Sequence, residues 1–394
     1  MQRLYYSGAP VDLLLVDNEL KRTQEIDIVG GTSSLIALAK TVVSDAFVPD
    51  YTKIIYEKFL SRQLIRLNAD VTKTAYDDID DIFQLIEQTS EAYYKLTAGS
   101  LQHEPKDAGK IYELLREEKL LQKEAANDIN GIDTSFTELN GLTNGWQKTD
   151  LTIIAARPSG GKTAFSLALA LAAVNAMAPT LIFSLKMSDK QLGERMISCI
   201  SELELSRVRR PNEMSKQEWG RFEHYGKIFR DYPLYIDDTA GINLFNMRAK
   251  VRRMRMKYGI QLVIVDYLQL MTGVGNEGNR EQEISRISRG LKAIAKDFDI
   301  PVIALSQLSR SIENGAGEAT RDPRLSDLRE SGAIEQDADN VIFITNPGAD
   351  MINENPYYFG KKFITIAKGR NIGLGRVCLE FNSDIQRWRT PDVF

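Results

Sequence analysis

The spacing of apolar residues indicates helices in the first part of the chain. Over residues 1–96, apolar side chains recur every three or four positions, in the sets Ile54, Ile55, Phe59, Leu64, Ile65 and Ile79, Ile82, Phe83, Ile86. This spacing places apolar side chains on one face of a helix, where they can face a core. Residues 1–96 are therefore predicted to form a small all-α domain, and nothing in them suggests chemistry.

Residues 97–131 are polar and interrupted by glycine and proline, which is typical of a linker. Inside this stretch one short amphipathic helix is predicted from the apolar residues Ile111, Leu114, Leu115, Leu120 and Leu121. Its apolar stripe could pack on its own domain or dock on a neighbouring subunit. We favour docking on a neighbouring subunit.

The pattern changes from about residue 150, where short apolar runs alternate with helical stretches. Near-continuous apolar strands separated by helices predict a largely parallel sheet that is covered on both faces. The last two runs follow each other closely and predict an antiparallel hairpin or edge. The predicted strands are Leu151–Ala155, Leu181–Leu185, Leu234–Ile236, Leu262–Val265, Val302–Leu305, Val341–Ile344, Phe363–Ile366 and Val377–Phe381. Residues 132–394 are thus predicted to form one α/β domain.

A glycine-rich segment follows the first of these strands and precedes a helix. It reads ARPSGGKT over residues 156–163. Glycines let backbone N–H groups approach phosphate oxygens, and the helix N-terminus adds partial positive charge. The predicted phosphate-binding residues are Ser159, Gly160, Gly161, Lys162, Thr163 and Ala164. In such a loop the lysine reaches the β- and γ-phosphates and the threonine hydroxyl binds Mg²⁺. The alternative is an ordinary glycine turn.

Two polar residues end later strands at the same expected edge of the sheet. Asp266 ends the apolar run Leu262–Val265, and Gln307 follows Val302–Leu305. An aspartate after a buried strand is a weak signal alone, but downstream of a phosphate loop it indicates a carboxylate that holds Mg²⁺. Gln307 could sense the γ-phosphate or simply end its strand.

Composition excludes several classes of protein. The 394 residues hold 50 Lys and Arg against 54 Asp and Glu, a net charge of −4, which argues against coating nucleic acid by bulk charge but leaves room for a local phosphate-binding surface. The two cysteines lie far apart in sequence, so no disulfide framework is expected, and with two histidines neither a Cys/His zinc cluster nor a His-based catalytic triad can be assembled. No apolar run reaches the length of a membrane span, and the N-terminus lacks the pattern of a signal peptide, so a cytoplasmic protein is predicted.

One basic segment precedes the strand that ends in Asp266. Its cations are Arg248, Lys250, Arg252, Arg253, Arg255 and Lys257. On a helix this spacing distributes them around the axis instead of along one stripe. A solvated or subunit-facing surface is therefore the favoured interpretation, and a DNA-binding stripe is the alternative.

Several segments together resemble the replicative DNA helicases of DnaB type. The resemblance covers essentially the whole chain, and its most specific part is the run DLRESGAIEQDAD over residues 327–339. It implies a RecA-like P-loop motor domain with a smaller all-α N-terminal domain. Residues 4–20 resemble the middle of that N-terminal domain, so the chain is expected to start about fifty residues late for a domain of that kind. The other matching segments are 155–165, 183–188, 235–239, 265–270 and 304–310.

The resemblance implies an activity, cofactors and partners. Members of the family form ring hexamers that use ATP and Mg²⁺ to move 5′→3′ on single-stranded DNA and to unwind duplex at the replication fork. Primase and a helicase loader are the implied protein partners, and the source is expected to be bacterial or a phage. A RecA-type recombinase shares the motor fold, but the helical N-terminal domain and the DLRESG run disfavour it.

The resemblance also implies residue roles. Lys162 and Thr163 bind phosphate and magnesium, Asp266 is the metal-binding acid, Gln307 is the sensor and Arg195 lies near the nucleotide. Lys368 and Arg370 resemble the pair that a neighbouring subunit inserts towards the γ-phosphate, although the intervening Gly369 and the nearby Ile372 depart from the family pattern. The implied DNA-binding residues are Arg329, Glu330 and Gly332.

One departure concerns catalysis. Where the family has Ser-Leu-Glu-Met-Ser, this chain has Ser-Leu-Lys-Met-Ser, with Lys186 at the position of the catalytic glutamate. Lysine cannot take a proton from water at neutral pH unless its pKa is strongly lowered. Asp189 and Glu194 are the nearest carboxylates in sequence that could replace it. The alternative function is therefore a hydrolysis-impaired paralogue that acts as a nucleotide-gated, DNA-binding or regulatory ring.

Overall fold

The computed structural model separates into two compact units, Met1–Lys106 and Asp107–Phe394, which are described one at a time. The structure describes residues 13–40, 48–77, 82, 85, 88–89, 92–93, 96, 107–124, 129–271, 280–308, 322–328 and 332–391. The predicted division of the chain after residues 96 and 131 stays a prediction.

The described part of the first unit is helical, as predicted. Its helices are α2 (Leu13–Arg22), α3 (Gly31–Lys40) and α4 (Val48–Tyr76). The predicted core-facing stripe lies in α4 but is exposed, from 44% at Phe59 to 67% at Ile65. Periodicity shows which side chains share a face and not what covers that face, so the expected burial is wrong for the isolated chain. Ile82 is 49% exposed, whereas Ile79, Phe83 and Ile86 lie outside the described residues.

The second unit is built on one nine-stranded sheet with the order β3-β2-β4-β5-β1-β6-β7-β8-β9. The first six strands of this order pair in parallel, and the last three pair antiparallel. The predicted parallel sheet and the closing hairpin are thus confirmed. The strands are β1 (Leu151–Ala156), β2 (Thr180–Ser184), β3 (Leu234–Asp237), β4 (Leu262–Asp266), β5 (Val302–Gln307), β6 (Asn340–Thr345), β7 (Lys361–Gly369), β8 (Gly375–Asn382) and β9 (Arg387–Arg389). Sequence patterning missed β9, which is short and holds one apolar residue.

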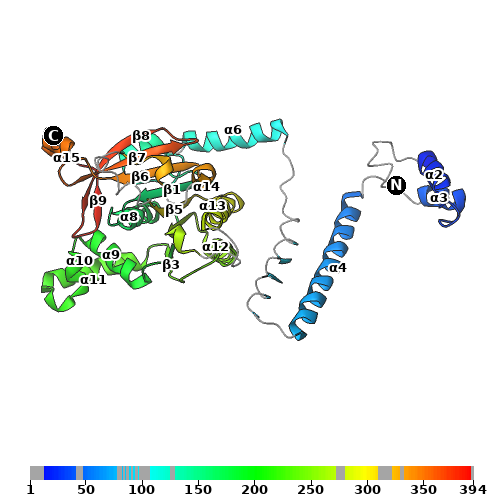
Figure 1. The fold of residues 1–394 in the computed structure, drawn as a ribbon, viewed down its shortest axis with the longest axis horizontal. Helices are drawn as coiled ribbons and strands as arrows, with labels where there is room; N and C mark the ends of the chain where they lie inside the picture. The colour runs from blue at the N-terminus through cyan, green and yellow to red at the C-terminus, as the bar shows by residue number, and fades with distance from the viewer. Residues whose placement is uncertain are drawn as a thin grey trace. The chain divides into compact units, whose positions relative to one another are not determined.

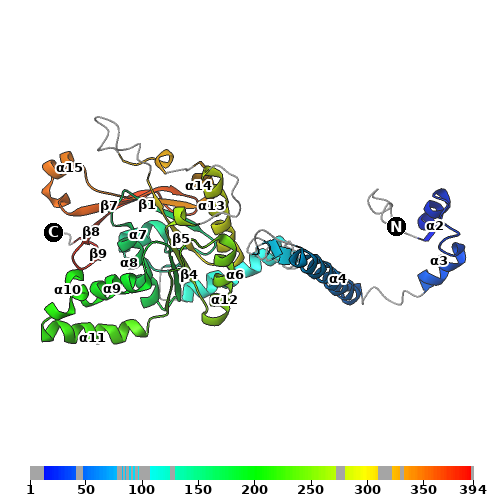
Figure 2. The ribbon, with the colours of Figure 1, turned by 60° about the horizontal axis from the view of Figure 1, so that its bottom comes forward.

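Helices cover both faces of the sheet (Figures 1 and 2). Alternate residues of β1 point to opposite faces, so Leu151 and Ile153 join one buried cluster and Ile154 joins the other. Residues of α12 (Leu244–Tyr258) and α13 (Arg280–Asp297) complete the first cluster, and those of α8 (Lys162–Asn175) and α9 (Asp189–Ser201) complete the second. This double burial explains why the strands are apolar along their whole length.

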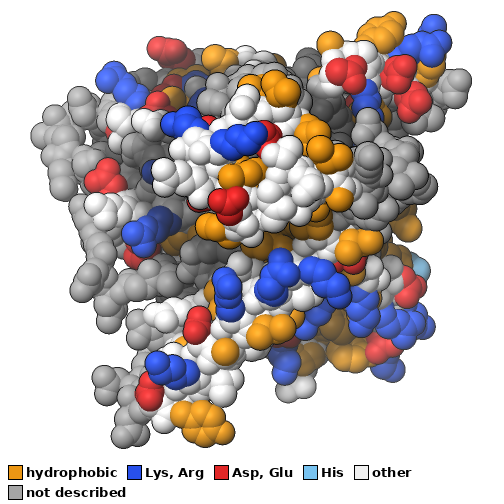
Figure 3. Space-filling model, turned by 90° about the vertical axis from the view of Figure 1, so that its right-hand side faces the viewer, with side chains coloured by type: hydrophobic (Ala, Val, Ile, Leu, Met, Phe, Trp, Pro, Cys, Tyr) orange, Lys and Arg blue, Asp and Glu red, His pale blue; other side chains and the backbone are white. Residues whose placement is uncertain are grey.

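The remaining helices are shorter or peripheral. They are α6 (Ala108–Glu124), α7 (Thr137–Thr143), α10 (Leu205–Arg209), α11 (Lys216–Arg230), α14 (Gly332–Asp337) and α15 (Ala349–Glu354). The predicted linker helix thus forms as α6, with Ile111 and Leu115 44% and 48% exposed. Figure 3 shows, for one side of the molecule, that hydrophobic side chains reach the surface between charged ones. Within the described parts of the chain, no helix is long and apolar enough to span a bilayer.

Candidate nucleotide-binding site

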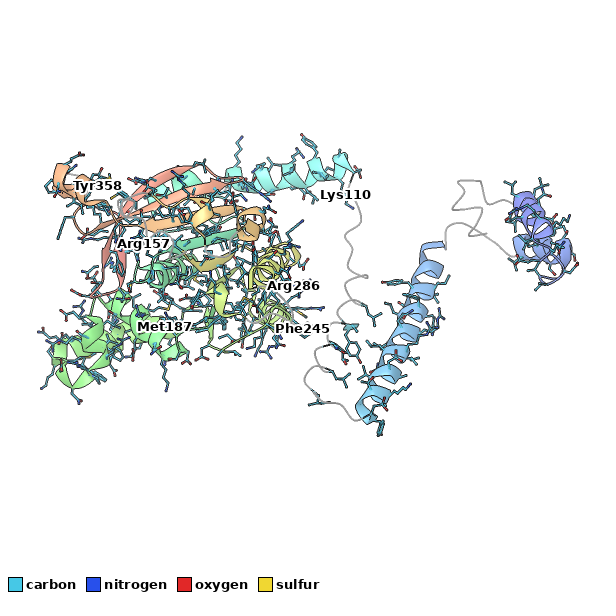
Figure 4. All side chains as sticks on the ribbon, viewed as in Figure 1. Lys110, Arg157, Met187, Phe245, Arg286 and Tyr358 are labelled. Atoms are coloured by element: carbon cyan, nitrogen blue, oxygen red, sulfur yellow. The ribbon has the colours of Figure 1, made fainter. Side chains whose placement is uncertain are left out.

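The loop between β1 and α8 contains two positions, Gly160 and Gly161, at which a side chain does not fit. Gly161 has φ 90°, and a Cβ there would lie 2.9 Å from the Trp388 ring. A Cβ on Gly160 would lie 2.9 Å from the Arg157 carbonyl oxygen. Helix α8 begins directly after Gly161, so the loop directs the helix N-terminus at any bound anion. Figure 4 labels Arg157 in this loop and Met187 after β2.

Lys162 is the first residue of α8, and its ammonium group is held inside the site. Its Nζ donates to the Ser306 carbonyl oxygen at 2.8 Å and lies 5.2 Å from the centroid of the Tyr267 ring. The pKa of Lys162 is lowered to about 8, mainly by burial; the charge of Asp266 acts to raise it, and the charge of Lys186 acts to lower it. An anion that neutralises this charge is therefore favoured here.

Thr163, in the first turn of α8, contacts Asp266, the last residue of β4. The Thr163 hydroxyl donates to Asp266 Oδ2 at 2.7 Å, and Asp266 is only 4% exposed. Burial raises the pKa of Asp266, while the hydrogen bond from Thr163 and the charge of Lys162 act to lower it. The peptide bond from Asp266 to Tyr267 is cis. The pair offers adjacent oxygen atoms, the ligands that Mg²⁺ prefers.

The predicted sensor lies beside the phosphate loop, and a second glutamine joins it that sequence reasoning missed. Gln307 is in register with Ala156, directly before the loop. Gln269 donates from Nε2 to the Ser306 hydroxyl at 2.8 Å. Ser306 therefore links Gln269 to Lys162 through its hydroxyl and its carbonyl. The only sequence signal for Gln269 was a polar residue in the apolar turn after Asp266.

Arg195 and Lys186 approach the same edge of the sheet. Arg195 extends from α9 and donates to the Gln386 side chain, and burial followed by the charge of Arg209 lowers its pKa. The charge of Arg195 in turn acts on the pKa of Asp266, which places it in the electrostatic reach of the site. Lys186 is exposed, with its Nζ 6.0 Å from the centroid of the Tyr267 ring.

The two carboxylates that could replace a glutamate at position 186 have other partners. Asp189 accepts a hydrogen bond from the Lys190 backbone amide at 2.6 Å. Glu194 pairs with Arg209 at 3.1 Å. Neither contact directs a carboxylate at the phosphate loop.

An aromatic cluster that the sequence did not reveal supports the phosphate loop. Trp388 of β9 meets Phe165 of α8 edge to face, with the ring centroids 5.0 Å apart, and stacks on Phe381 at 4.8 Å. Trp388 is 5% exposed and is the side chain that a Cβ on Gly161 would strike. The last strand thus fixes the position of the loop.

Lys368 and Arg370 lie at the opposite end of the strands. Lys368 is in register with Val341, and the Arg370 backbone amide donates to the Asp339 carbonyl oxygen. Because β6 runs parallel to β1, Arg370 lies beside Asp339 and Leu151 at the start of β1 and Lys368 is level with Ile153, whereas the phosphate loop follows Ala156 at the end of the strand. Five residue steps of strand, about 17 Å, separate Leu151 from Ala156, and three steps, about 10 Å, separate Ile153 from Ala156. The chain therefore does not bring these cations to its own phosphate loop.

Position 369, between the two cations, has no room for a side chain, so glycine is required there. A Cβ on Gly369 would lie 2.7 Å from the Ile372 carbonyl oxygen and 2.6 Å from the Ile372 side chain. The two departures from the family pattern thus occur where the backbone folds back on itself.

The predicted DNA-binding residues are mostly outside the described structure. Arg329 and Glu330 lie outside the described residues, and Gly332 begins α14. In the basic helix α12, Met247 and Val251 are buried. Lys250 of that helix pairs with Asp237 at 2.6 Å, and Arg248 pairs with Asp297. Part of its charge is thus neutralised within the chain.

The glycine loop, the buried aspartate and the strand order define a P-loop ATPase of RecA-like architecture. The family model described as DnaB-like helicase C terminal domain matches residues 131–390, and the DnaB-like helicase N terminal domain matches residues 1–57. The chain therefore belongs to the DnaB-like helicase family and has the function of that family, an ATP-dependent replicative helicase.

Curated relatives and solved structures agree with this assignment. The replicative DNA helicase DnaB of Geobacillus stearothermophilus is 37% identical over 390 residues, covering 98% of this chain and 85% of the relative. The replicative DNA helicase DnaC of Bacillus subtilis is 38% identical, covering 97% of this chain and 83% of the relative. Neither relative favours the alternative of a hydrolysis-impaired paralogue.

The solved structures extend the likeness to three dimensions. One of them, described as an ATPase domain, has a TM-score of 0.66 and 32% identity, covering 73% of this chain and all of that one. A DnaB-like replicative helicase, solved in a study of its interactions with primase, has a TM-score of 0.73 and 28% identity over 98% of this chain and 89% of its own.

Proposed function

We propose that this helicase moves along single-stranded DNA in the 5′→3′ direction and unwinds duplex DNA at the replication fork, as a hexameric ring with ATP bound between subunits. The observation that carries the proposal is the separation of the phosphate loop from Lys368 and Arg370, at opposite ends of the strands. A complete site then needs a second copy of the chain, and a ring provides the same interface at every subunit.

The residues around the phosphate loop suit ATP with Mg²⁺. The loop amides and the Lys162 ammonium hold the phosphates, and Arg195 adds charge from α9. The adjacent oxygen atoms of Thr163 and Asp266 would hold Mg²⁺, which would neutralise part of the phosphate charge when bound. Gln307, next to the loop, is placed to respond to the γ-phosphate.

The neighbouring subunit supplies the remaining charge. Lys368 and Arg370 of one copy reach the γ-phosphate held by the next copy, and stabilise the negative charge that develops during phosphoryl transfer. Hydrolysis then depends on the contact between subunits. Hydrolysis of each ATP is thereby coupled to the contact between the two subunits that share the site.

DNA and protein partners follow from the family. Arg329, Glu330 and Gly332 are the proposed DNA-binding residues, and in this segment glycine and backbone amides would hold phosphates without sequence preference. Primase and a helicase loader are the protein partners, and the cytoplasm of a bacterium, or of the host of a phage, is the location. Both cysteines, Cys199 and Cys378, are free thiols, as expected in a reducing compartment.

The linker helix α6 provides a second contact between copies. Its apolar residues Ile111, Leu114, Leu115 and Leu120 are all more than two-fifths exposed. Docking of this stripe on the neighbouring motor domain buries apolar surface that the chain alone leaves in water.

Strand displacement on forked DNA tests the proposal. The full chain with ATP and Mg²⁺ is expected to separate a fork with a 5′ tail and to leave a fork with only a 3′ tail intact. A Lys162→Ala variant is the control and should displace neither. Binding of single-stranded DNA that depends on ATP but displaces no strand would instead support the nucleotide-gated ring that Lys186 suggests. Displacement from the 3′ tail alone would overturn the assigned polarity.

A further inference from the structure

Asp339 is a buried carboxylate at which three parts of the motor domain meet. It lies between α14 and β6 and is 3% exposed. Its Oδ2 accepts hydrogen bonds from the Leu151 backbone amide at 2.8 Å and from Lys292 Nζ at 2.6 Å. Lys292 also donates to the Thr149 carbonyl oxygen at 2.8 Å. The contacts with Leu151 and Lys292 thus fix the carboxylate to the start of β1 and to α13, independently of Arg370.

The second oxygen of the same carboxylate holds Arg370. Arg370 Nη1 donates to Asp339 Oδ1 at 3.3 Å, and Nη2 donates to the Gln336 carbonyl oxygen at 3.0 Å. The Arg370 backbone amide donates to the Asp339 carbonyl oxygen at 3.0 Å. Arg370 is still 51% exposed, so its guanidinium group is anchored along one edge and open to solvent on the other.

Lys368 is anchored on the same support by different atoms. Its Nζ donates to the Ala338 carbonyl oxygen at 2.7 Å and to the Glu335 carbonyl oxygen, both at the C-terminal end of α14. Carbonyl groups at this end of a helix carry partial negative charge and attract cations. The two cations therefore share one platform, made by the end of α14 and Asp339.

We propose that Asp339 is a positioning residue for ATP hydrolysis in the neighbouring subunit, acting through Arg370. This inference rests on the proposed function, in which Arg370 reaches the nucleotide of the next copy. Arginine has a long side chain with many rotamers, and holding it in one arrangement before the reaction removes the cost of ordering it during the reaction. Asp339 restricts the backbone of Arg370 and one edge of its guanidinium, and leaves the other edge for the phosphate.

Asp339 is buried, which distinguishes its contact with Arg370 from an ordinary ion pair at the surface. An exposed ion pair adds little, because water screens it and both side chains must be ordered. Asp339 is already ordered by Leu151 and Lys292, so its oxygen directs Arg370 without further ordering. The pair formed by Glu380 and Arg389, 3.0 Å apart on β8 and β9, is a more exposed comparison in the same sheet.

Mixing two variants with impaired hydrolysis tests the inference. Lys162→Ala removes the cation of the phosphate loop and keeps Asp339 and Arg370, whereas Asp339→Asn keeps the loop and loses the anchor. In a ring assembled from equal amounts of both full-length chains, about a quarter of the interfaces join an intact loop to an intact Arg370. DNA-stimulated ATP hydrolysis by the mixture is then expected to reach about a quarter of the wild-type rate, well above either variant alone.

Two further variants control for folding. Asp339→Asn leaves Lys292 without its carboxylate, so a double variant with Lys292→Met removes both charges and is expected to melt close to the wild type. It should still show a reduced kcat, with the affinity for a fluorescent ATP analogue unchanged. Glu380→Gln, the same loss of an arginine-paired carboxylate elsewhere in the sheet, should leave kcat unchanged.

The outcomes separate this inference from the function on which it rests. Arg370→Ala mixed with Lys162→Ala is the reference pair. Recovery by the reference pair without recovery by the Asp339→Asn pair would overturn the role of Asp339 and leave the shared site standing. Failure of both pairs would overturn the shared site itself. Wild-type kcat in a well-folded double variant would also overturn the role of Asp339.

Discussion

Nucleotide affinity is expected to fall as the pH rises from about 7.5 to about 9.5, because Lys162 loses its proton in the free protein over this interval. Burial lowers the pKa of its ammonium group from 10.5 to about 8. Bound phosphates favour the charged form and raise this pKa again. Binding in the alkaline range therefore takes up a proton, and its affinity decreases as protons become scarce.

The size of the decrease in affinity follows from the fraction of free protein in which Lys162 is protonated. With a pKa of about 8, roughly three quarters of free Lys162 is protonated at about pH 7.5 and roughly 3% at about pH 9.5. If only the protonated form binds, the apparent affinity falls about 25-fold between these two values. A lysine with an ordinary pKa would change its affinity by only about 10% over the same interval.

Isothermal titration with a non-hydrolysable ATP analogue and saturating Mg²⁺ measures the change, and buffers of different ionisation enthalpy count the protons taken up. Lys162→Arg is the matched control, because a guanidinium stays charged throughout and its profile should be flat. Lys186→Gln removes a charge that lowers the pKa of Lys162. The decrease in nucleotide affinity of this variant should therefore begin at a higher pH than in the wild type. A wild-type affinity that changes less than about twofold, or a Lys162→Arg profile equally steep, would refute the reasoning.

The other predictions concern the same edge of the sheet. Lys186→Glu tests the alternative of a hydrolysis-impaired ring: because the chain is an active helicase, the rate of DNA-stimulated ATP hydrolysis of this variant should stay within about tenfold of the wild-type rate, and a gain of about 10²-fold or more, the size of a restored general base, would instead favour the impaired ring. Gly161→Ala should lower the melting temperature and abolish binding of a fluorescent nucleotide, because of its φ of 90° and the Trp388 ring at 2.9 Å, whereas Gly141→Ala in α7, with nothing within 4 Å, should leave nucleotide binding unchanged and should not lower the melting temperature. Trp388→Ala should lower the free energy of unfolding in urea by roughly 3–5 kcal/mol, and a loss below about 1 kcal/mol would show that the cluster does not support the loop.

Local patterns were sufficient to predict the sheet and the phosphate loop. Apolar runs such as Leu262–Val265 end in polar residues, and parallel strands bring their carboxyl ends to one edge. Neighbouring strands in the sheet therefore place Asp266 and Gln307 close to the loop, although the chain separates them from it by more than a hundred residues. A glycine at φ 90° before a helix is equally a local feature, and Gly161 could be named from sequence alone.

The rest of the site depends on contacts that no local pattern records. Trp388 supports the loop only because β9 folds back beside α8, and a three-residue strand leaves almost no periodic signal. The link from Gln269 to Lys162 passes through both polar groups of Ser306. That Lys368 lies at the far end of the strands follows from its antiparallel register with β6, which the sequence does not fix.

Helix α14 has a consequence for how DNA and ATP could influence one another. It is six residues long, from Gly332 in the proposed DNA-binding loop to Asp337, just before the carbonyl group of Ala338 that holds Lys368. The six-residue helix, about 9 Å long, therefore connects the proposed DNA-binding residue Gly332 to the carbonyl group that holds Lys368. Under the proposed function, a displacement of Gly332 by bound DNA would be transmitted through this short helix to the position of Lys368.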